Sequence, residues 1–160
     1  MTPFAWLLGL FLPACGANGA QGLPVPTLMD VAHIVRPSSP NTALGAPVGF
    51  SPTPDVTTPV YPLSAPRLYA AVETMAAAQP RTFLATAFAE QLQVHYVVRS
   101  ALFNFPDLVT VQVTADGPDA SHLVLYSRSI YGESDLGVNR KRIDTWLAAL
   151  QSDMPQTRER

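Results

Sequence analysis

Alternation of apolar and polar residues predicts four strands in the second half of the chain. The clearest case is residues 107–115 (DLVTVQVTA), where a valine at every second position faces one way and threonine or glutamine faces the other. The predicted strands are residues 82–88, 91–100, 107–115 and 121–130, and Asp-Gly-Pro-Asp at 116–119 is a turn signal between the last two. Because these connections are short, we expect antiparallel pairing.

Apolar residues spaced three and four apart predict one helix on each side of this run of strands. The first is expected to start at Pro66, with Ser64 as its cap, and to end before Pro80. The second is expected to be capped by Asp135 or a neighbour and to continue to about Leu150. The order helix, strands, helix predicts an α+β fold: an antiparallel sheet of about four strands with two helices packed on one face.

This layered arrangement gives a specific expectation for the strand at 107–115. Val111 should lie inside, beneath Trp146 or Leu147 of the last helix, and Thr110 should lie on the opposite face. Val111→Asp would then bury an unpaired charge and prevent folding. Thr110→Asp would cost little if its face is open to water, and equal damage from both changes would mean that the sheet is covered on two sides.

Residues 16–66 differ from the rest of the chain. They contain ten of its 16 prolines and three charged residues, and frequent proline opposes helices and central strands. We interpret residues 16–27 as a tether and 28–66 as an extended segment laid over the domain, with a short helical turn at 28–34 and an edge strand at 56–61. The compact domain then covers residues 67–150, followed by a polar tail at 151–160.

The first 15 residues, MTPFAWLLGLFLPAC, have the pattern of an export signal. The apolar run from Phe4 to Leu12 is long enough for the core of a signal peptide and too short to cross a bilayer as a helix. It ends in Leu-Pro-Ala-Cys, which resembles a bacterial lipobox, in which Cys15 becomes the lipid-modified first residue. Two alternatives stay open: cleavage after Ala17 or Ala20 without lipid, and a buried N-terminal helix with Cys15 as a small apolar residue.

A lipidated Cys15 predicts a membrane-anchored protein that faces the periplasm. Gly16 and Ala17 follow it, so no acidic retention residue is present and the outer membrane is favoured in a bacterium with two membranes. Cleavage without lipid predicts a soluble periplasmic protein instead.

Residues 98–113 (VRSALFNFPDLVTVQV) and 126–150 (YSRSIYGESDLGVNRKRIDTWLAAL) form two long motifs of mixed composition, and SPNTAL at 39–44 is a shorter one. Together they resemble the bacterial family DUF1499, over about residues 35–150, with SPNTAL in the place of its upstream Pro-Asn motif. The resemblance implies a domain that often follows an export signal, in agreement with the first 15 residues. It implies no established activity, cofactor or catalytic residue.

Composition and charge narrow the classes of function. The chain is 48% hydrophobic and 14% charged with a formal net charge of -2, which argues against a nucleic-acid-binding protein, since such proteins usually show a basic face. One cysteine excludes an internal disulfide framework and a cysteine-based zinc site. His33, His95 and His122 lie far apart in the sequence, so we expect no metal site and no cofactor.

Four arginines are the strongest candidates for a binding site. Arg99 and Arg128 lie in predicted strands, where long cationic side chains need a partner, and Arg140 and Arg142 lie early in the last helix, where positive charge is unfavourable. Together with Asn139 and the backbone amides of residues 137–139, they could hold a small anion or a lipid headgroup.

The same arginines can instead pair with acidic side chains in a structural network that contains Asp107, Ser134 and Asp135. We expect Asp107 or Asp135 within hydrogen-bond reach of Arg128, Arg140 or Arg142. We also expect Asp107 close to Arg128, because antiparallel strands bring such ends together. A binding role requires one arginine that is unpaired and faces a cavity.

These observations favour an exported, lipid-anchored envelope domain that acts as a binding or structural module. Its expected partners are the membrane, through the lipid anchor, and a small anionic or lipid ligand. The alternative is a hydrolase-like enzyme that uses residues 127–142, where serines at 127, 129 and 134 are the nucleophile candidates. A protein-interaction module would show an exposed apolar patch instead of a cavity.

Overall fold

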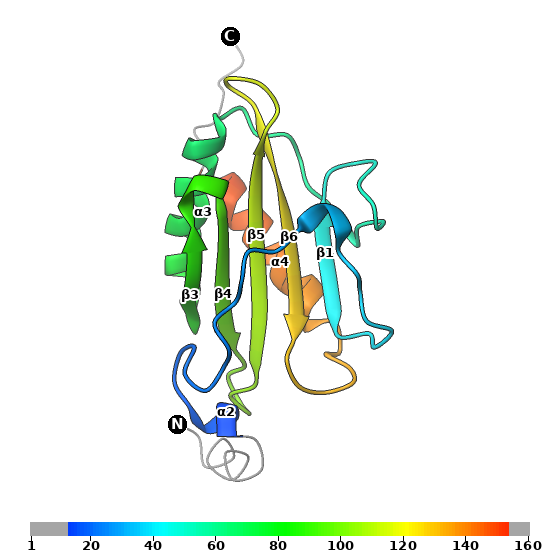
Figure 1. The fold of residues 1–160 in the computed structure, drawn as a ribbon, viewed down its shortest axis with the longest axis vertical. Helices are drawn as coiled ribbons and strands as arrows, with labels where there is room; N and C mark the ends of the chain where they lie inside the picture. Colours follow the sequence, from blue (N-terminus) through cyan, green and yellow to red (C-terminus); the bar gives the residue numbers. More distant parts are fainter. Residues whose placement is uncertain (1–12, 154–160) are drawn as a thin grey trace.

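The computed structural model describes residues 13–153 and has an α+β fold built on one mixed sheet (Figure 1). The sheet has six strands in the order β2-β1-β6-β5-β4-β3. The strands are β1 (Thr42–Ala46), β2 (Val56–Thr57), β3 (Thr82–Phe88), β4 (Gln93–Arg99), β5 (Pro106–Ala115) and β6 (Ser121–Ser129). The helices are α2 (Pro13–Gly16), α3 (Ala65–Ala78) and α4 (Val138–Ser152), and 3-10 turns occur at Val31–His33 and Ala89–Gln91.

The predicted α+β class is confirmed, and the number of strands and the purely antiparallel sheet are wrong. The four predicted strands form β3 to β6 and pair antiparallel. The proline-rich segment adds β1, antiparallel to β6, and the two-residue edge strand β2, parallel to β1. The segment TALGA of β1 lies between Pro40 and Pro47 and contains no proline, so its backbone is free to pair with the edge of β6.

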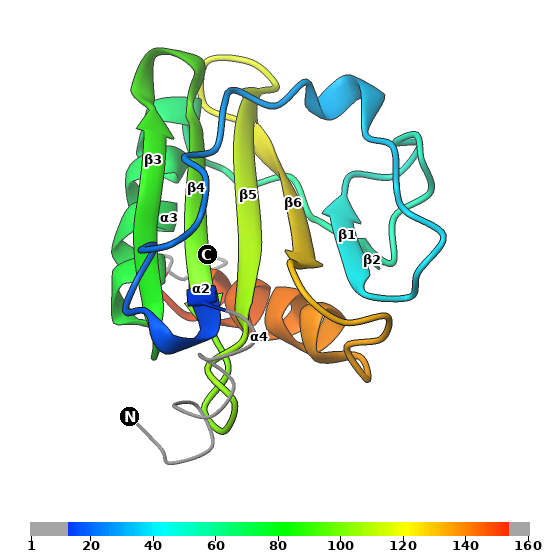
Figure 2. The same ribbon diagram turned by 60° about the horizontal axis from the view of Figure 1, so that its bottom comes forward.

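Helices α3 and α4 cover one face of the sheet, as predicted (Figures 1 and 2). Val111 is fully buried in the same apolar cluster as Trp146, and Tyr96 of β4 packs edge-on against the Trp146 ring, with the ring centroids 5.7 Å apart. Pro66 lies in the first turn of α3 and Ser64 occupies its N-cap position, as predicted, although the Ser64 side chain makes no capping hydrogen bond. The helix ends at Ala78, before Pro80, as expected.

The opposite face of the sheet is also covered, by the segment that leads into β1. In Figure 1 this segment crosses in front of β4 and β5, with α4 behind them. Thr110 points to this face and is 1% exposed. A second apolar cluster lies on the same side over β1 and β6 and is built from Ile34, Leu44, Ala46, Val124 and Tyr126. The assumption of a water-exposed second face is therefore wrong, and Thr110→Asp would bury a charge as Val111→Asp does.

The predicted signal core, Phe4–Leu12, and most of the predicted tail at 151–160 lie outside the described residues. Within residues 13–153 no helix is both long and apolar enough to span a membrane.

Candidate functional site

A buried ion pair joins β5 to α4 on the helix-covered face. Arg142 Nη2 donates to Asp107 Oδ2 at 2.6 Å, and both side chains are less than a tenth exposed. Arg142 Nη1 donates to Ser127 Oγ at 2.9 Å and to Asn139 Oδ1 at 2.6 Å. The expected contact between Asp107 and one of the arginines is present, and it locks the first turns of the helix to the sheet.

Asn139 completes this network and connects it to the Pro-Asn motif. Its Oδ1 accepts from Ser127 Oγ at 2.6 Å, and its Nδ2 donates to the Asn41 carbonyl and to Ser129 Oγ. Asn41 in turn donates to the Gly132 carbonyl at 2.7 Å. Two motifs far apart in the sequence thus meet at one end of the sheet, and the buried Asn139 is committed to structural contacts.

Asp135 caps the last helix from three residues before its start. Its carboxylate accepts from the backbone amides of Gly137 at 2.9 Å and Asn139 at 2.8 Å, and its carbonyl accepts from the Val138 amide. Ser134 Oγ accepts more weakly from the Leu136 amide at 3.3 Å. The amides of residues 137–139, expected to be open to an anion, are therefore already satisfied by Asp135.

Arg99 holds the N-terminal segment against the end of β4. Its guanidinium donates to the carbonyls of Gly19 (2.7 Å), Ala14 (2.6 Å) and Gln21 (3.3 Å), and it is almost fully buried. Asn104 supports it, with Nδ2 donating to the carbonyls of Cys15 and Ala17. A cation satisfied by so many backbone oxygens is a structural clamp, which removes Arg99 from the ligand-binding candidates.

The same segment is held a second time at Met29. The Gln93 side chain accepts from the Met29 amide at 2.7 Å and donates to the Met29 carbonyl at 2.9 Å, as a neighbouring strand would. Between this contact and the clamp at Arg99, residues 24–28 make no hydrogen bond with other described residues. We call residues 20–29 the strap. Pinned at both ends, it spans the sheet without pairing to it.

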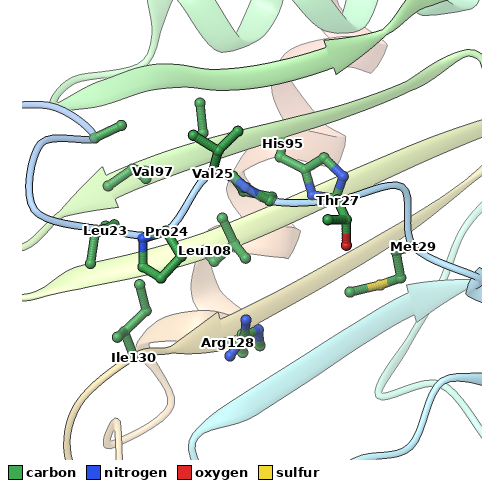
Figure 3. A pocket seen from close by; sticks show the side chains of 13 residues that line it. Leu23, Pro24, Val25, Thr27, Met29, His95, Val97, Leu108, Arg128 and Ile130 are labelled. Carbon is green, nitrogen blue, oxygen red and sulfur yellow. The ribbon is translucent and has the colours of Figure 1, made fainter.

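A cavity of about 480 Å³ lies between the strap and the sheet (Figure 3). Its roof is formed by the strap, whose side chains there are mainly apolar, and its floor by β3, β4, β5 and the end of β6. The floor residues are Ala85, His95, Val97, Leu108, Arg128 and Ile130. This volume is within the range of about 300–1,000 Å³ that is usual for small-molecule sites.

Arg128 is the cationic side chain that lines this cavity. It lies opposite Leu108 on β5, on the face away from the helices, and its guanidinium makes no hydrogen bond or ion pair with any residue between 13 and 153. The expected proximity to Asp107 is wrong, since Asp107 is paired with Ser129 and faces α4, and successive strand residues point to opposite faces. Arg128 therefore faces a largely apolar space without a counter-ion.

His95 is the other titratable group in the cavity wall. Its Nδ1 lies 2.9 Å from Thr110 Oγ1 and its Nε2 lies 2.9 Å from Gln93 Oε1. Burial lowers the pKa of His95, and the positive charge of Arg128 lowers it further. Arg128 is therefore the fixed charge of the cavity, beside a neutral imidazole.

The other candidate residues lie away from the cavity. Arg140 is exposed on α4, and Asp144 on the same helix is exposed as well. Cys15 is buried in α2, and burial raises the pKa of its thiol, although Arg99 acts against this. Among residues 13–153 no three histidine, cysteine or acidic side chains gather in a way that could hold a metal ion.

Sequence reasoning missed the cavity, although one signal was available. Gln93, His95 and Arg99 alternate along β4 on the face away from the helices, together with Val97. Polar residues at every second position of a central strand need partners on that face, so they indicate that something other than water covers it.

Comparison with known proteins gives a family but no activity. The family described as "Protein of unknown function (DUF1499)" matches residues 34–150. No curated protein matches the chain. Among solved structures, a DUF4468 family protein from Bacteroides ovatus is 17% identical, covers 70% of this chain and 95% of its own, and gives a TM-score of 0.34. A protein from Thermus thermophilus is 13% identical, covers 60% of this chain and 90% of its own, and gives a TM-score of 0.33. Similarity this low carries no argument about function.

Proposed function

We propose that this chain, which belongs to the DUF1499 family, is an exported envelope domain that binds an anionic ligand through Arg128. The observation that supports this is the guanidinium that lines a largely apolar cavity with no counter-ion among the described residues. Arg128 is half-buried, and a bound anion would supply the charged partner that its guanidinium lacks among the described residues. The other arginines of the predicted cluster are either satisfied internally, as Arg99 and Arg142 are, or exposed, as Arg140 is.

A fluorescent anion tests this proposal. Anilinonaphthalene sulfonate should bind the full chain at one saturable site, and Arg128→Gln should weaken binding about tenfold, the loss expected for one charged hydrogen bond. Arg67→Gln, on the exposed surface of α3, is the matched control and should leave binding unchanged. Equal binding by the chain and by Arg128→Gln would refute the anion site.

The proposed attachment is a lipid on Cys15 after cleavage behind Ala14, with the outer membrane as the favoured location. The clamp supports this choice over cleavage further along. A chain that starts at Cys15 loses the Ala14 carbonyl, which accepts from Arg99 at 2.6 Å. It keeps the carbonyls of Cys15, Ala17, Gly19 and Gln21 for Asn104 and Arg99. Cleavage after Ala20 would remove three of these four acceptors and leave a buried guanidinium short of partners.

Intact mass of the membrane-bound protein tests the attachment. We expect loss of residues 1–14 and the added mass of a lipid. Because Cys15 is buried in the folded chain, a lipid on its thiol requires Cys15 to leave the position that it has here. A soluble mature form that begins after Cys15 would refute the lipid anchor without affecting the proposed anion site.

A further inference from the structure

A second hollow adjoins the cavity and shares two residues with it. This hollow has a volume of about 510 Å³ and lies over the ends of β1 and β6. Met29 and Arg128 line both spaces. Its lining includes the apolar residues Val35 and Pro37 and the polar residues Arg36, Ser39, Asn41, Thr42, Tyr126 and Ser129. The two spaces therefore meet at one arginine, and the second one adds polar side chains beside it.

The charges where the two spaces meet favour an anionic ligand. Arg36, the other cation of the second hollow, is already paired with Asp55 at 2.8 Å and donates to Thr42. Arg128 remains as the cation without a counter-ion among the described residues. A neutral ligand would leave its charge unmatched, and a cationic ligand would add repulsion.

The lining of the first cavity favours a ligand that has a hydrocarbon chain. The half-buried Leu23 and the exposed Pro24 and Val25 border it from the strap, and Val97 and Leu108 form its floor (Figure 3). The strap makes no hydrogen bond to the sheet between its two fixed ends, so its apolar residues can separate from the floor without breaking backbone pairing. A flexible hydrocarbon chain matches such a space, since it has no polar groups that would be left unsatisfied there.

From this juxtaposition we infer that the ligand is a single-chain anionic amphiphile, with its hydrocarbon chain in the cavity beneath the strap and a phosphate or carboxylate at Arg128. The rest of a larger headgroup lies in the second hollow. This inference rests on the proposed anion site and adds the class of ligand to it. A free acid and a lipid headgroup share the chemistry that Arg128 recognises, so the two sources must be separated by experiment.

A chain-length series on the unmodified full chain is the first test, because it requires no variant to fold. Binding of ethyl, hexyl and dodecyl phosphate, each below its critical micelle concentration, is measured by calorimetry beside inorganic phosphate. We expect one site per chain and an affinity that rises at least tenfold from ethyl to dodecyl phosphate. Neutral dodecyl maltoside should bind at least tenfold more weakly than dodecyl phosphate. Equal affinity for lysophosphatidylglycerol and dodecyl phosphate would assign a lipid source, and preference for dodecanoate would assign a free acid.

Variants then locate the two parts of the ligand. Arg128→Gln should weaken dodecyl phosphate at least tenfold, and Arg128→Lys should restore most of the loss. Ala85→Phe adds a ring to the cavity from β3 and should weaken dodecyl phosphate at least tenfold while leaving ethyl phosphate unchanged. Ala87→Phe, on the other face of the same strand, is the control and should bind as the unmodified chain does.

The outcomes separate this inference from the proposed function. Binding of all phosphates with equal affinity would overturn the amphiphile and leave the anion site standing. Equal binding of dodecyl phosphate and dodecyl maltoside, with no effect of Arg128→Gln, would overturn both. Binding of anilinonaphthalene sulfonate at Arg128 with no binding of any alkyl phosphate or dodecanoate would overturn the amphiphile alone.

Discussion

Replacing Asp107 with alanine should leave the Arg142 guanidinium buried beneath α4 without its counter-ion. The two side chains are 7% and 9% exposed, and the bond between them is 2.6 Å long. Arg142 would keep its contacts to Ser127 and Asn139, which are neutral acceptors and do not compensate the charge. Breaking a buried pair on one side costs about 3–5 kcal/mol, so we expect Asp107→Ala to lower the free energy of unfolding by about 3 kcal/mol, toward the lower bound because two hydrogen bonds remain.

Replacing both Asp107 and Arg142 should lower the free energy of unfolding much less than replacing Asp107 alone. Burial raises the pKa of Asp107 even though the Arg142 guanidinium acts in the opposite direction, so the buried carboxylate carries a desolvation cost that its removal relieves. In Asp107→Leu combined with Arg142→Met, Ser127 Oγ still donates to Asn139 Oδ1, so both atoms stay bonded. The double variant should therefore recover at least half of the loss.

Urea unfolding of the single and double variants, followed by circular dichroism, measures these free energies. The double-mutant cycle of Asp107→Leu, Arg142→Met and the two combined should give a coupling of about 2 kcal/mol between Asp107 and Arg142. Asp144→Ala, at an exposed position of α4, is the control and should change stability by less than about 0.5 kcal/mol. If Asp107→Ala resembles Asp144→Ala, or if the double variant is as unstable as the sum of the single ones, the argument from an uncompensated buried charge is refuted.

Two further predictions concern the two faces of the sheet. A Cβ at Gly45 would lie 2.9 Å from Ile143 Cγ2, so Gly45→Ala should force β1 and α4 apart and lower the free energy of unfolding by about 1–3 kcal/mol; an unchanged urea midpoint would contradict this close approach. The pKa of His95 is lowered by burial and then by Arg128, so its contribution to stability is complete above about pH 6.5 and is lost as the pH falls from there toward the pKa of the folded state. The slope of stability against pH between 5 and 7 should shrink in His95→Gln and, to a smaller degree, in Arg128→Gln.

The strands of the second half could be predicted because each carries a local signal. Alternating valines place β5 with its Val111 face toward the helices, and the turn at 116–119 fixes the pairing of β6, with Ala115 opposite Ser121. Strand β1 carries no such pattern, since five small or aliphatic residues read equally well as part of an extended connection. It forms because β6 offers an unpaired edge, which is a property of the sheet and not of the segment itself.

The pairing register between β5 and β6 explains why Arg128 does not pair with Asp107. Counting from Ala115 opposite Ser121 puts Asp107 opposite Ser129 and Leu108 opposite Arg128. Asp107 and Arg128 therefore point to opposite faces although they are close along the strands. With this count the sequence alone would have paired Asp107 with the helix and left Arg128 on the other face.

The cover over Arg128 could not be derived from the sequence in this way. The strap has neither a period of two nor a period of 3.6, and its prolines remove amides that would have paired with a strand. Its position depends on the side chains of Arg99 and Gln93, which bind its backbone carbonyls and amide. Such contacts do not depend on the side chains of the strap itself. When side chains hold a covering segment by its backbone, the sequence signal lies in those side chains, here the polar positions of β4. The covering segment itself carries no such signal. Buried polar side chains that alternate along a central strand are therefore the feature by which such a strap, and the cavity beneath it, can be sought in other sequences.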